Sequence, residues 1–190
     1  MLGVVALIAF VVAYVAISER RPWPFALVGG WSTFFVVAWL MRFVHAGGGT
    51  AFALAAGACA AGLLVIPRRP APAFDARDHP RWDLPVRALC ALLPVVAITA
   101  AANRLGAHAS GILASFPVIT PVVSAFTQAH YGPRESTRLL HGFTIGFFAY
   151  SFFCLAVSVG LESLGIGAAF ALASLAALAI QAAAVRLSAA

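Results

Sequence analysis

The chain has 190 residues, of which 63% are hydrophobic and only 9% are charged, and its mean hydropathy is +0.98. Soluble domains carry about 25% charged residues, so this composition excludes a soluble domain and indicates an all-α polytopic membrane protein. The net charge of +6 comes from 12 arginines, without any lysine. The arginines fall between apolar runs, where they are typical of topology signals and lipid-headgroup contacts, not of a nucleic-acid surface.

Apolar runs separated by short polar segments predict seven transmembrane helices. A loop is expected at residues 130–138, and Glu162 and Gly165 mark a tight turn before the last helix. The expected helices cover residues 2–17, 23–44, 50–66 and 84–102, then a broken fifth span that follows a turn at 103–108 and ends near 128, and finally residues 139–161 and 167–185.

One longer polar segment separates the third and fourth spans. Residues 67–84 hold four prolines, so an irregular connector is expected. Asp75, Asp78 and His79 within it have the chemistry of a weak metal site. A solvated loop is the favoured interpretation because further ligands are missing, and we expect neither a metal nor another cofactor.

The arginine distribution predicts the orientation of the helices. Ten of the 12 arginines lie in the turns after the first, third and fifth spans and in the C-terminal tail. Arg42 and Arg104 lie on the other side. Because arginine is enriched in cytoplasmic loops, the N-terminus is predicted outside and the C-terminus in the cytoplasm.

An internal repeat appears when the chain is compared with itself at an offset of 118 residues. The matches include Arg20 with Arg138, Phe25 with Phe143, and Gly47 with Gly165. This predicts a three-plus-one-plus-three plan with parallel repeats, because an odd linker helix leaves both triplets in the same orientation. The predicted units are residues 1–66 (first triplet), 67–84 (cytoplasmic connector), 85–103 (linker helix) and 104–190 (second triplet).

The broken fifth span is the candidate substrate path. It carries Pro117 and Pro121 four residues apart, and each proline removes a helical hydrogen bond that lipid cannot replace. Such backbone persists where protein or a wet cavity satisfies it. A proline-kinked packing helix is the equally weighted alternative. The candidate path residues are Ser115, Phe116, Pro117, Thr120, Pro121, Ser124 and, in the sixth span, Tyr150.

An outer gate is the second candidate feature. Arg104, His108 and Glu162 are all predicted at the outer face. One acid with nearby basic groups is typical of a gate or of a vestibule that attracts anions. Solvated turn residues are the slightly favoured alternative.

From the fourth span onward, the chain resembles GlpM, a family of small four-span bacterial inner-membrane proteins. The resemblance covers residues 85–185, about half the chain. It rests on the run Ser-Gly-Ile-Leu-Ala-Ser-Phe-Pro at residues 110–117, on Gly132, on Tyr150, and on Ala-Ala-Phe at 168–170. The extra N-terminal half and Pro121 depart from the family pattern. The resemblance implies an inner-membrane location and a four-helix unit, and it points to small polar solutes or lipid-linked sugars.

Two functions are left open by the sequence. The favoured one is a multi-pass inner-membrane transporter or channel for a small polar or anionic solute. The alternative is a non-transporting accessory protein that binds partner helices through small-residue faces such as Gly57 and Ala61. No enzyme is expected, because catalytic motifs with a nucleophile and a nearby base are missing. The expected partners are membrane lipid and the solute, without nucleic acid, and a homo-oligomer is left open.

Overall fold

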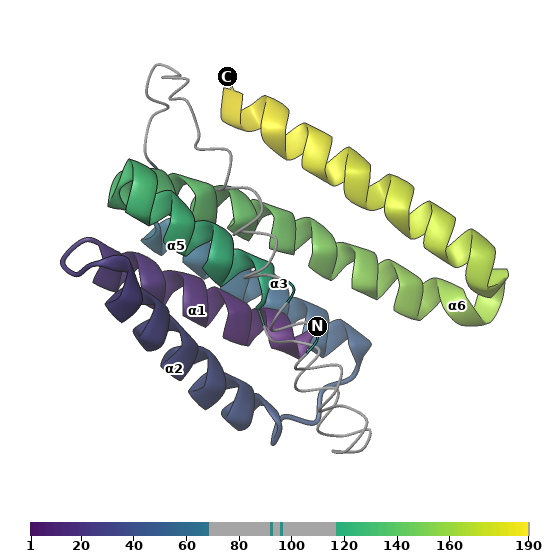
Figure 1. Cartoon of the computed structure of the whole chain (residues 1–190). Coiled ribbons are helices and arrows are strands. Elements are labelled where there is room, and N and C mark those ends of the chain that lie inside the picture. Colours follow the sequence, from purple (N-terminus) through teal and green to yellow (C-terminus); the bar gives the residue numbers. More distant parts are fainter. Residues whose placement is uncertain (69–91, 93–95, 97–116, 190) are drawn as a thin grey trace.

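A computed structural model of the chain describes residues 1–68 and 117–189, with Leu92 and Val96 between them. The predicted fourth span, most of the connector, and Ser115, Phe116, Arg104 and His108 lie outside these residues. Every regular element in the described part is a helix (Figure 1): α1 (Leu2–Ser18), α2 (Trp23–Met41), α3 (Gly48–Val65), α5 (Ile119–Tyr131) and α6 (Pro133–Ala189).

The last of these elements, α6, consists of two helices joined at Gly165, whose φ of 74° breaks the helical path. We call Pro133–Leu161 the first arm and Leu164–Ala183 the second arm. The two arms form a hairpin in Figure 1. The expected turn at Gly165 is therefore confirmed, because glycine adopts a positive φ without a Cβ clash.

Four described helices are long and apolar enough to cross a membrane, namely α2, α3 and the two arms of α6. A bilayer core needs about 20 apolar residues in a helix. α1 has 17 residues and α5 has 13, so both are shorter than this. The chain is thus a multi-pass membrane protein by these helices, whereas seven spans and their orientation stay predictions.

The expected loop at residues 130–138 is wrong. Gly132 alone, with φ of 87°, separates α5 from α6, and Pro133 begins the first arm. Proline suits the first helical position because its φ is already helical and its missing N–H has no partner there. The polar residues that follow support the first turns, since Glu135 pairs with Arg138 at 3.4 Å. The sixth helix therefore starts six residues earlier than its apolar run.

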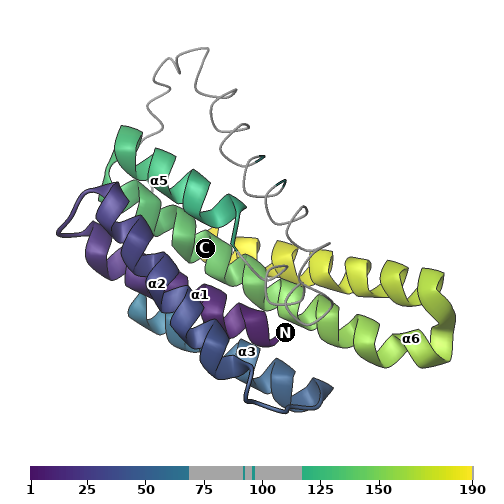
Figure 2. The same cartoon turned by 60° about the horizontal axis from the view of Figure 1, so that its bottom comes forward.

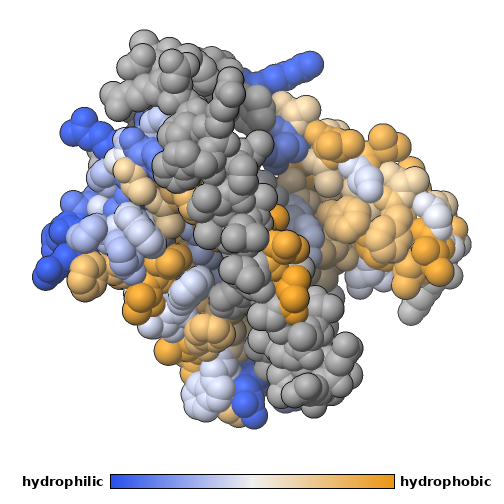
Figure 3. Space-filling view, viewed as in Figure 1, coloured by the Kyte–Doolittle hydropathy of each residue, from blue (hydrophilic) through white to orange (hydrophobic). Residues whose placement is uncertain are grey.

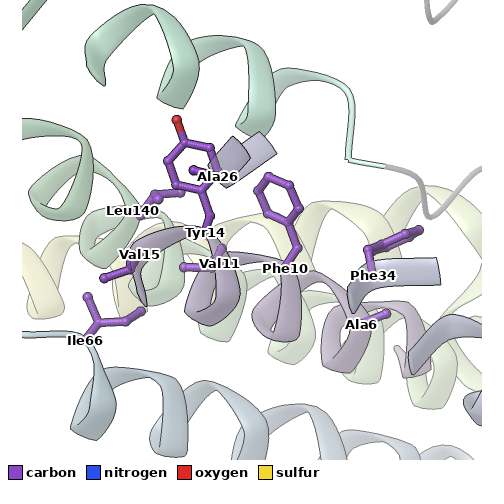
Figure 4. Close-up of a cluster of buried hydrophobic side chains, with 9 residues drawn as sticks. All are labelled: Ala6, Phe10, Val11, Tyr14, Val15, Ala26, Phe34, Ile66 and Leu140. Carbon is purple, nitrogen blue, oxygen red and sulfur yellow. The ribbon is translucent and has the colours of Figure 1, made fainter. Parts of the chain in front are cut away.

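The described fold is organised around α1, which packs against α2, α3 and α6 (Figures 1 and 2). Phe10 and Tyr14 of α1 are fully buried, with Phe34 of α2 and Leu140 of α6 in the same cluster (Figure 4). Gly30 of α2 permits this packing, because a Cβ there would lie 2.7 Å from the Phe10 ring.

Small residues also bring α3 against its neighbours. Its buried stripe consists of Ala51, Ala55, Cys59 and Gly62. A Cβ on Gly62 would lie 2.9 Å from Ile8 and 3.5 Å from Thr144, so glycine allows close helix contact here. Gly57, in contrast, is exposed on the other side of α3.

Large apolar side chains cover the outside of the described helices. They include Phe25, Phe35 and Trp39 of α2 and Leu175 and Leu178 of the second arm. Figure 3 shows hydrophobic residues over the second arm at the right and hydrophilic residues at the left end. Such a surface would promote aggregation in water, but it matches the hydrocarbon of a bilayer.

Candidate functional site

A cleft of about 720 Å³ opens where α1 and α5 begin, beside the middle of the first arm. Gly142 to Tyr150 of that arm lie roughly 14 to 26 Å along it at a rise of about 1.5 Å per residue, so the cleft lies beside the middle of this arm. Its described lining residues are Met1, Gly3, Val4 and Leu7 of the α1 region; Pro117, Val118, Ile119 and Thr120 of the α5 region; Gly142, Phe143, Gly146, Phe147 and Tyr150 of the first arm; and Gln181 of the second arm.

Three of the predicted path residues meet in this cleft. Pro117 and Thr120 line it from the start of α5, and Tyr150 lines it from the first arm. Pro117 and Val118 precede α5, and the residues before Pro117 lie outside the described part, so the predicted break at Pro117 stays a prediction. Pro121 does not interrupt α5. It lies in the first turn of α5, where its missing N–H would have no helical partner.

Pro121 and Ser124 do not line the cleft. Both are buried on α5, and the Ser124 carbonyl accepts a 3.1 Å hydrogen bond from the Ser136 hydroxyl of the first arm. They hold α5 against α6. Ser115 and Phe116 lie outside the described residues, so their predicted place in the path stays a prediction.

The predicted outer gate also stays a prediction. Arg104 and His108 lie outside the described residues, and Glu162 lies within α6 without a described side chain. The conjectured metal ligands Asp75, Asp78 and His79 are outside as well. Within the described part of the chain, His, Cys, Asp and Glu form no group of three or more that could hold a metal ion.

Gln181 is a lining residue that sequence reasoning missed. It lies on the second arm and contributes to the cleft, and its amide oxygen Oε1 is buried without a hydrogen-bond partner among the described residues. One sequence signal would have found it: an isolated glutamine in an otherwise apolar helix. Polar residues at membrane depth are costly and are therefore functional candidates.

The cleft combines an apolar wall with neutral polar groups. Phe143, Phe147 and Leu7 supply apolar surface, whereas the polar side chains are Thr120, Tyr150 and Gln181. This is the usual make-up of a small-molecule site, with a mostly apolar wall and a few polar groups that orient the ligand.

A buried polar cluster holds α5 in place at the end of the bundle away from the cleft. The Tyr14 hydroxyl of α1 donates to Gln128 Oε1 of α5 at 2.8 Å. Gln128 Nε2 in turn donates to the carbonyls of Ser18 at 3.4 Å and Arg21 at 3.2 Å. Ser18 ends α1 and Arg21 lies in the turn after it, where carbonyls lack helical partners. The cluster thereby fixes α5, and with it one wall of the cleft, against α1.

Comparison with protein-family models, curated proteins and solved structures gives no match to this chain. The resemblance to the GlpM family therefore stays a prediction. Function has to be argued from the cleft itself.

Proposed function

We propose that this chain is a small integral-membrane transporter or channel for a small polar or anionic solute, and that the cleft is part of its path. The observation that supports this proposal most directly is the position of the cleft. It lies at the middle of the first arm and is bounded by α1 and α5, the first helices of the two predicted triplets. Transporters built from repeats place their substrate sites near the bilayer midplane at the repeat interface.

Two lining glycines support this proposal. A Cβ on Gly142 or Gly146 would have no neighbour within 4 Å. Both residues therefore leave open space on the cleft side of the first arm. A larger side chain at either position would enter the cleft without disturbing the described packing.

Gly146→Leu tests the path directly. We expect the leucine side chain to fill the cleft and to abolish most of the flux. The fold should be retained, because replacing a helical glycine removes a penalty of about 1 kcal/mol. The measurement is solute flux in proteoliposomes for glycerol, glucose, lactate and phosphate.

Gly57→Leu is the matched control for this variant. Gly57 is also helical, and a Cβ at this position would likewise have no neighbour within 4 Å, but the residue lies on α3 away from the cleft. Flux should be unchanged in this control. Wild-type flux in Gly146→Leu, or no flux of any solute through the wild-type protein, would contradict the proposed path.

A second candidate function is a non-transporting accessory protein that binds partner helices or a second copy. The observation that favours it is the outward face of α3, where Gly57 and Ala61 are exposed. Small exposed residues let another helix approach closely. The second-arm residues Ala173 and Ala177 fit this role less well, since Ala173 is buried. Gly57→Leu should then abolish recovery of a partner or oligomer after crosslinking in membranes.

Both proposals place the chain in a bacterial inner membrane, as a multi-pass protein surrounded by lipid. The arginine-rich turns would face the cytoplasm.

A further inference from the structure

A shallow groove runs along the outward face of α2 near its C-terminal end. The groove has a volume of about 560 Å³, and its described lining residues are Phe35, Val36, Ala38, Trp39 and Arg42. The three large apolar side chains among them are each more than half exposed. Because α2 is long and apolar enough to cross a membrane, the molecules that meet such a groove are the acyl chains of lipids.

The two tryptophans near the ends of α2 indicate how deep the groove lies. Trp23 begins the helix, and Trp39 lies roughly 24 Å further along its axis at about 1.5 Å per residue. This separation is close to the thickness of a hydrocarbon core, about 30 Å, and tryptophan is enriched at both membrane–water interfaces. Trp39 and Arg42 are therefore expected at the level of the headgroups, with Phe35 about 10 Å deeper than Arg42.

Arg42 supplies a positive charge at the headgroup end of the groove. Its side chain is exposed, and its guanidinium carbon lies 5.1 Å from the centroid of the Phe43 ring. The ring stabilises the charge, whereas the N–H groups of a guanidinium match the oxygens of a phosphate. Residues 22–67 hold neither aspartate nor glutamate, so α2 and α3 supply no carboxylate that would compete for this guanidinium.

We propose that this end of α2 binds an anionic phospholipid, whose phosphate pairs with Arg42 and whose acyl chain lies in the groove against Phe35 and Trp39. A zwitterionic lipid suits the site less well, because its own ammonium group partly neutralises the phosphate. The inference goes beyond the proposed transport function and holds whether or not the chain transports a solute.

The test is quenching of Trp39 fluorescence by lipids with brominated acyl chains. The full-length protein is placed in phosphatidylcholine vesicles with an increasing fraction of brominated phosphatidylglycerol or brominated phosphatidylcholine. Each protein is compared with its Trp39→Phe version, and the difference is the signal of Trp39. Brominated phosphatidylglycerol should quench this signal at about a tenth of the mole fraction that brominated phosphatidylcholine needs, the effect of one charge-assisted hydrogen bond.

Arg42→Gln should remove this tenfold preference, because the amide carries no charge. Arg186→Gln is the matched control, since Arg186 is also an exposed arginine near a helix end but lies outside the groove. The preference should survive in this control. Loss of the preference in both variants would indicate an effect of net charge alone and would overturn the inference.

Two further outcomes would also overturn it. One is equal quenching of the wild-type protein by the two lipids, a comparison that stays decisive if Arg42→Gln fails to fold. The other is relief of quenching by glycerol 3-phosphate, which has the phosphate without the acyl chains and would reveal a site for a free phosphate compound. We expect glycerol 3-phosphate to leave the quenching unchanged.

Discussion

At the scale of single residues, Gln128 has the most connected side chain in the described hydrogen-bond network. Its amide joins α1, the turn after α1, and α5 through one accepted and two donated hydrogen bonds. The Tyr14 hydroxyl and the Gln128 amide are shielded from water, since Tyr14 is fully buried and Gln128 is 8% exposed, whereas the bond to the Arg21 carbonyl is partly buried. Removing one member therefore leaves the others without hydrogen-bond partners. Because unpaired buried polar groups are costly, buried networks are sensitive to substitution.

Gln128→Leu should destabilise the protein by about 1–3 kcal/mol, because it orphans the Tyr14 hydroxyl and two carbonyls. Tyr14→Phe should cost less, about 1 kcal/mol, since it removes one hydrogen bond. The measurement is the free energy of unfolding of each variant and of the double variant. The two effects should be less than additive, because the residues contact each other. Additive effects would show that the Tyr14–Gln128 bond is not formed.

The candidate path residues show how much of the cleft lining can be predicted from the sequence pattern. Pro117, Thr120 and Tyr150 were predicted from a broken helix and a mid-span tyrosine, and they line one cleft. Ser124 was chosen for its closeness in sequence to the prolines. It lies one turn beyond Thr120 on nearly the same face of α5, about 6 Å further along the helix axis, where it is buried against the first arm and not in the cleft.

At the scale of elements, the cleft exists because α1 and α5 are shorter than the first arm. The first arm has 29 residues, whereas α1 and α5 have 17 and 13. All three elements meet at the end that holds Gln128 and Ser136. α1 and α5 therefore begin beside the middle of the first arm, and the cleft lies at their first residues.

The turn at Gly132 determines how α5 and the first arm form a hairpin. Gly132→Ala should destabilise the protein by about 1–3 kcal/mol, because its φ of 87° and ψ of 174° lie in a region that is essentially restricted to glycine. The cost is purely conformational, since a Cβ there meets nothing within 4 Å. Gly142→Ala is the control, because that glycine is helical with equally open surroundings, and it should be neutral or stabilising. Thermal unfolding of both variants checks this, and equal stability of the two would contradict it.

Helix ends were the least predictable part of the elements. The apolar run placed the sixth helix at residue 139, yet the first arm starts at Pro133. Hydropathy marks where a helix meets lipid, not where its hydrogen bonding begins. A helix can extend into water when local interactions support it, as the Thr137 hydroxyl bonded to the Pro133 carbonyl at 2.9 Å does here.

At the scale of the whole molecule, five of the seven described arginines gather at one end of the bundle. Arg20 and Arg21 follow α1, Arg68 follows α3, and Arg134 and Arg138 begin the first arm. Figure 1 shows these helix ends together at the left. Arg42 follows α2 at the other end, over the ring of Phe43. The fold therefore brings together five of the ten arginines that the predicted topology places on one side, and the orientation itself stays a prediction.

Cysteine labelling in membranes tests which end of the bundle faces the cytoplasm. In a variant without the native cysteines, a cysteine at Arg20 should react with impermeant reagent only from the cytoplasm. A cysteine at His45, in the turn after α2, should react only from outside. The reason is the excess of arginine around residue 20 and its scarcity around residue 45. Labelling of both positions from the same side would contradict the orientation.

The predicted repeat is not settled by the described helices. The offset of 118 residues pairs Gly47, the residue before α3, with Gly165, at the kink between the two arms of α6. Their backbones differ, with φ of −67° at Gly47 and 74° at Gly165. The linker helix at residues 85–103 lies outside the described part, so the three-plus-one-plus-three plan stays a prediction.

The sequence by itself determined that the chain is helical and apolar outside, and roughly where most of its helices run, because hydropathy and glycine or proline positions act locally. Only the tertiary structure decided that α1 is the buried centre, that Gly62 and not Gly57 packs, and that Gln181 lines the same cleft as Thr120 and Tyr150. These outcomes depend on contacts between residues far apart in the chain. A uniformly apolar helix has no polar face that would reveal in its sequence which side packs against protein and which faces lipid.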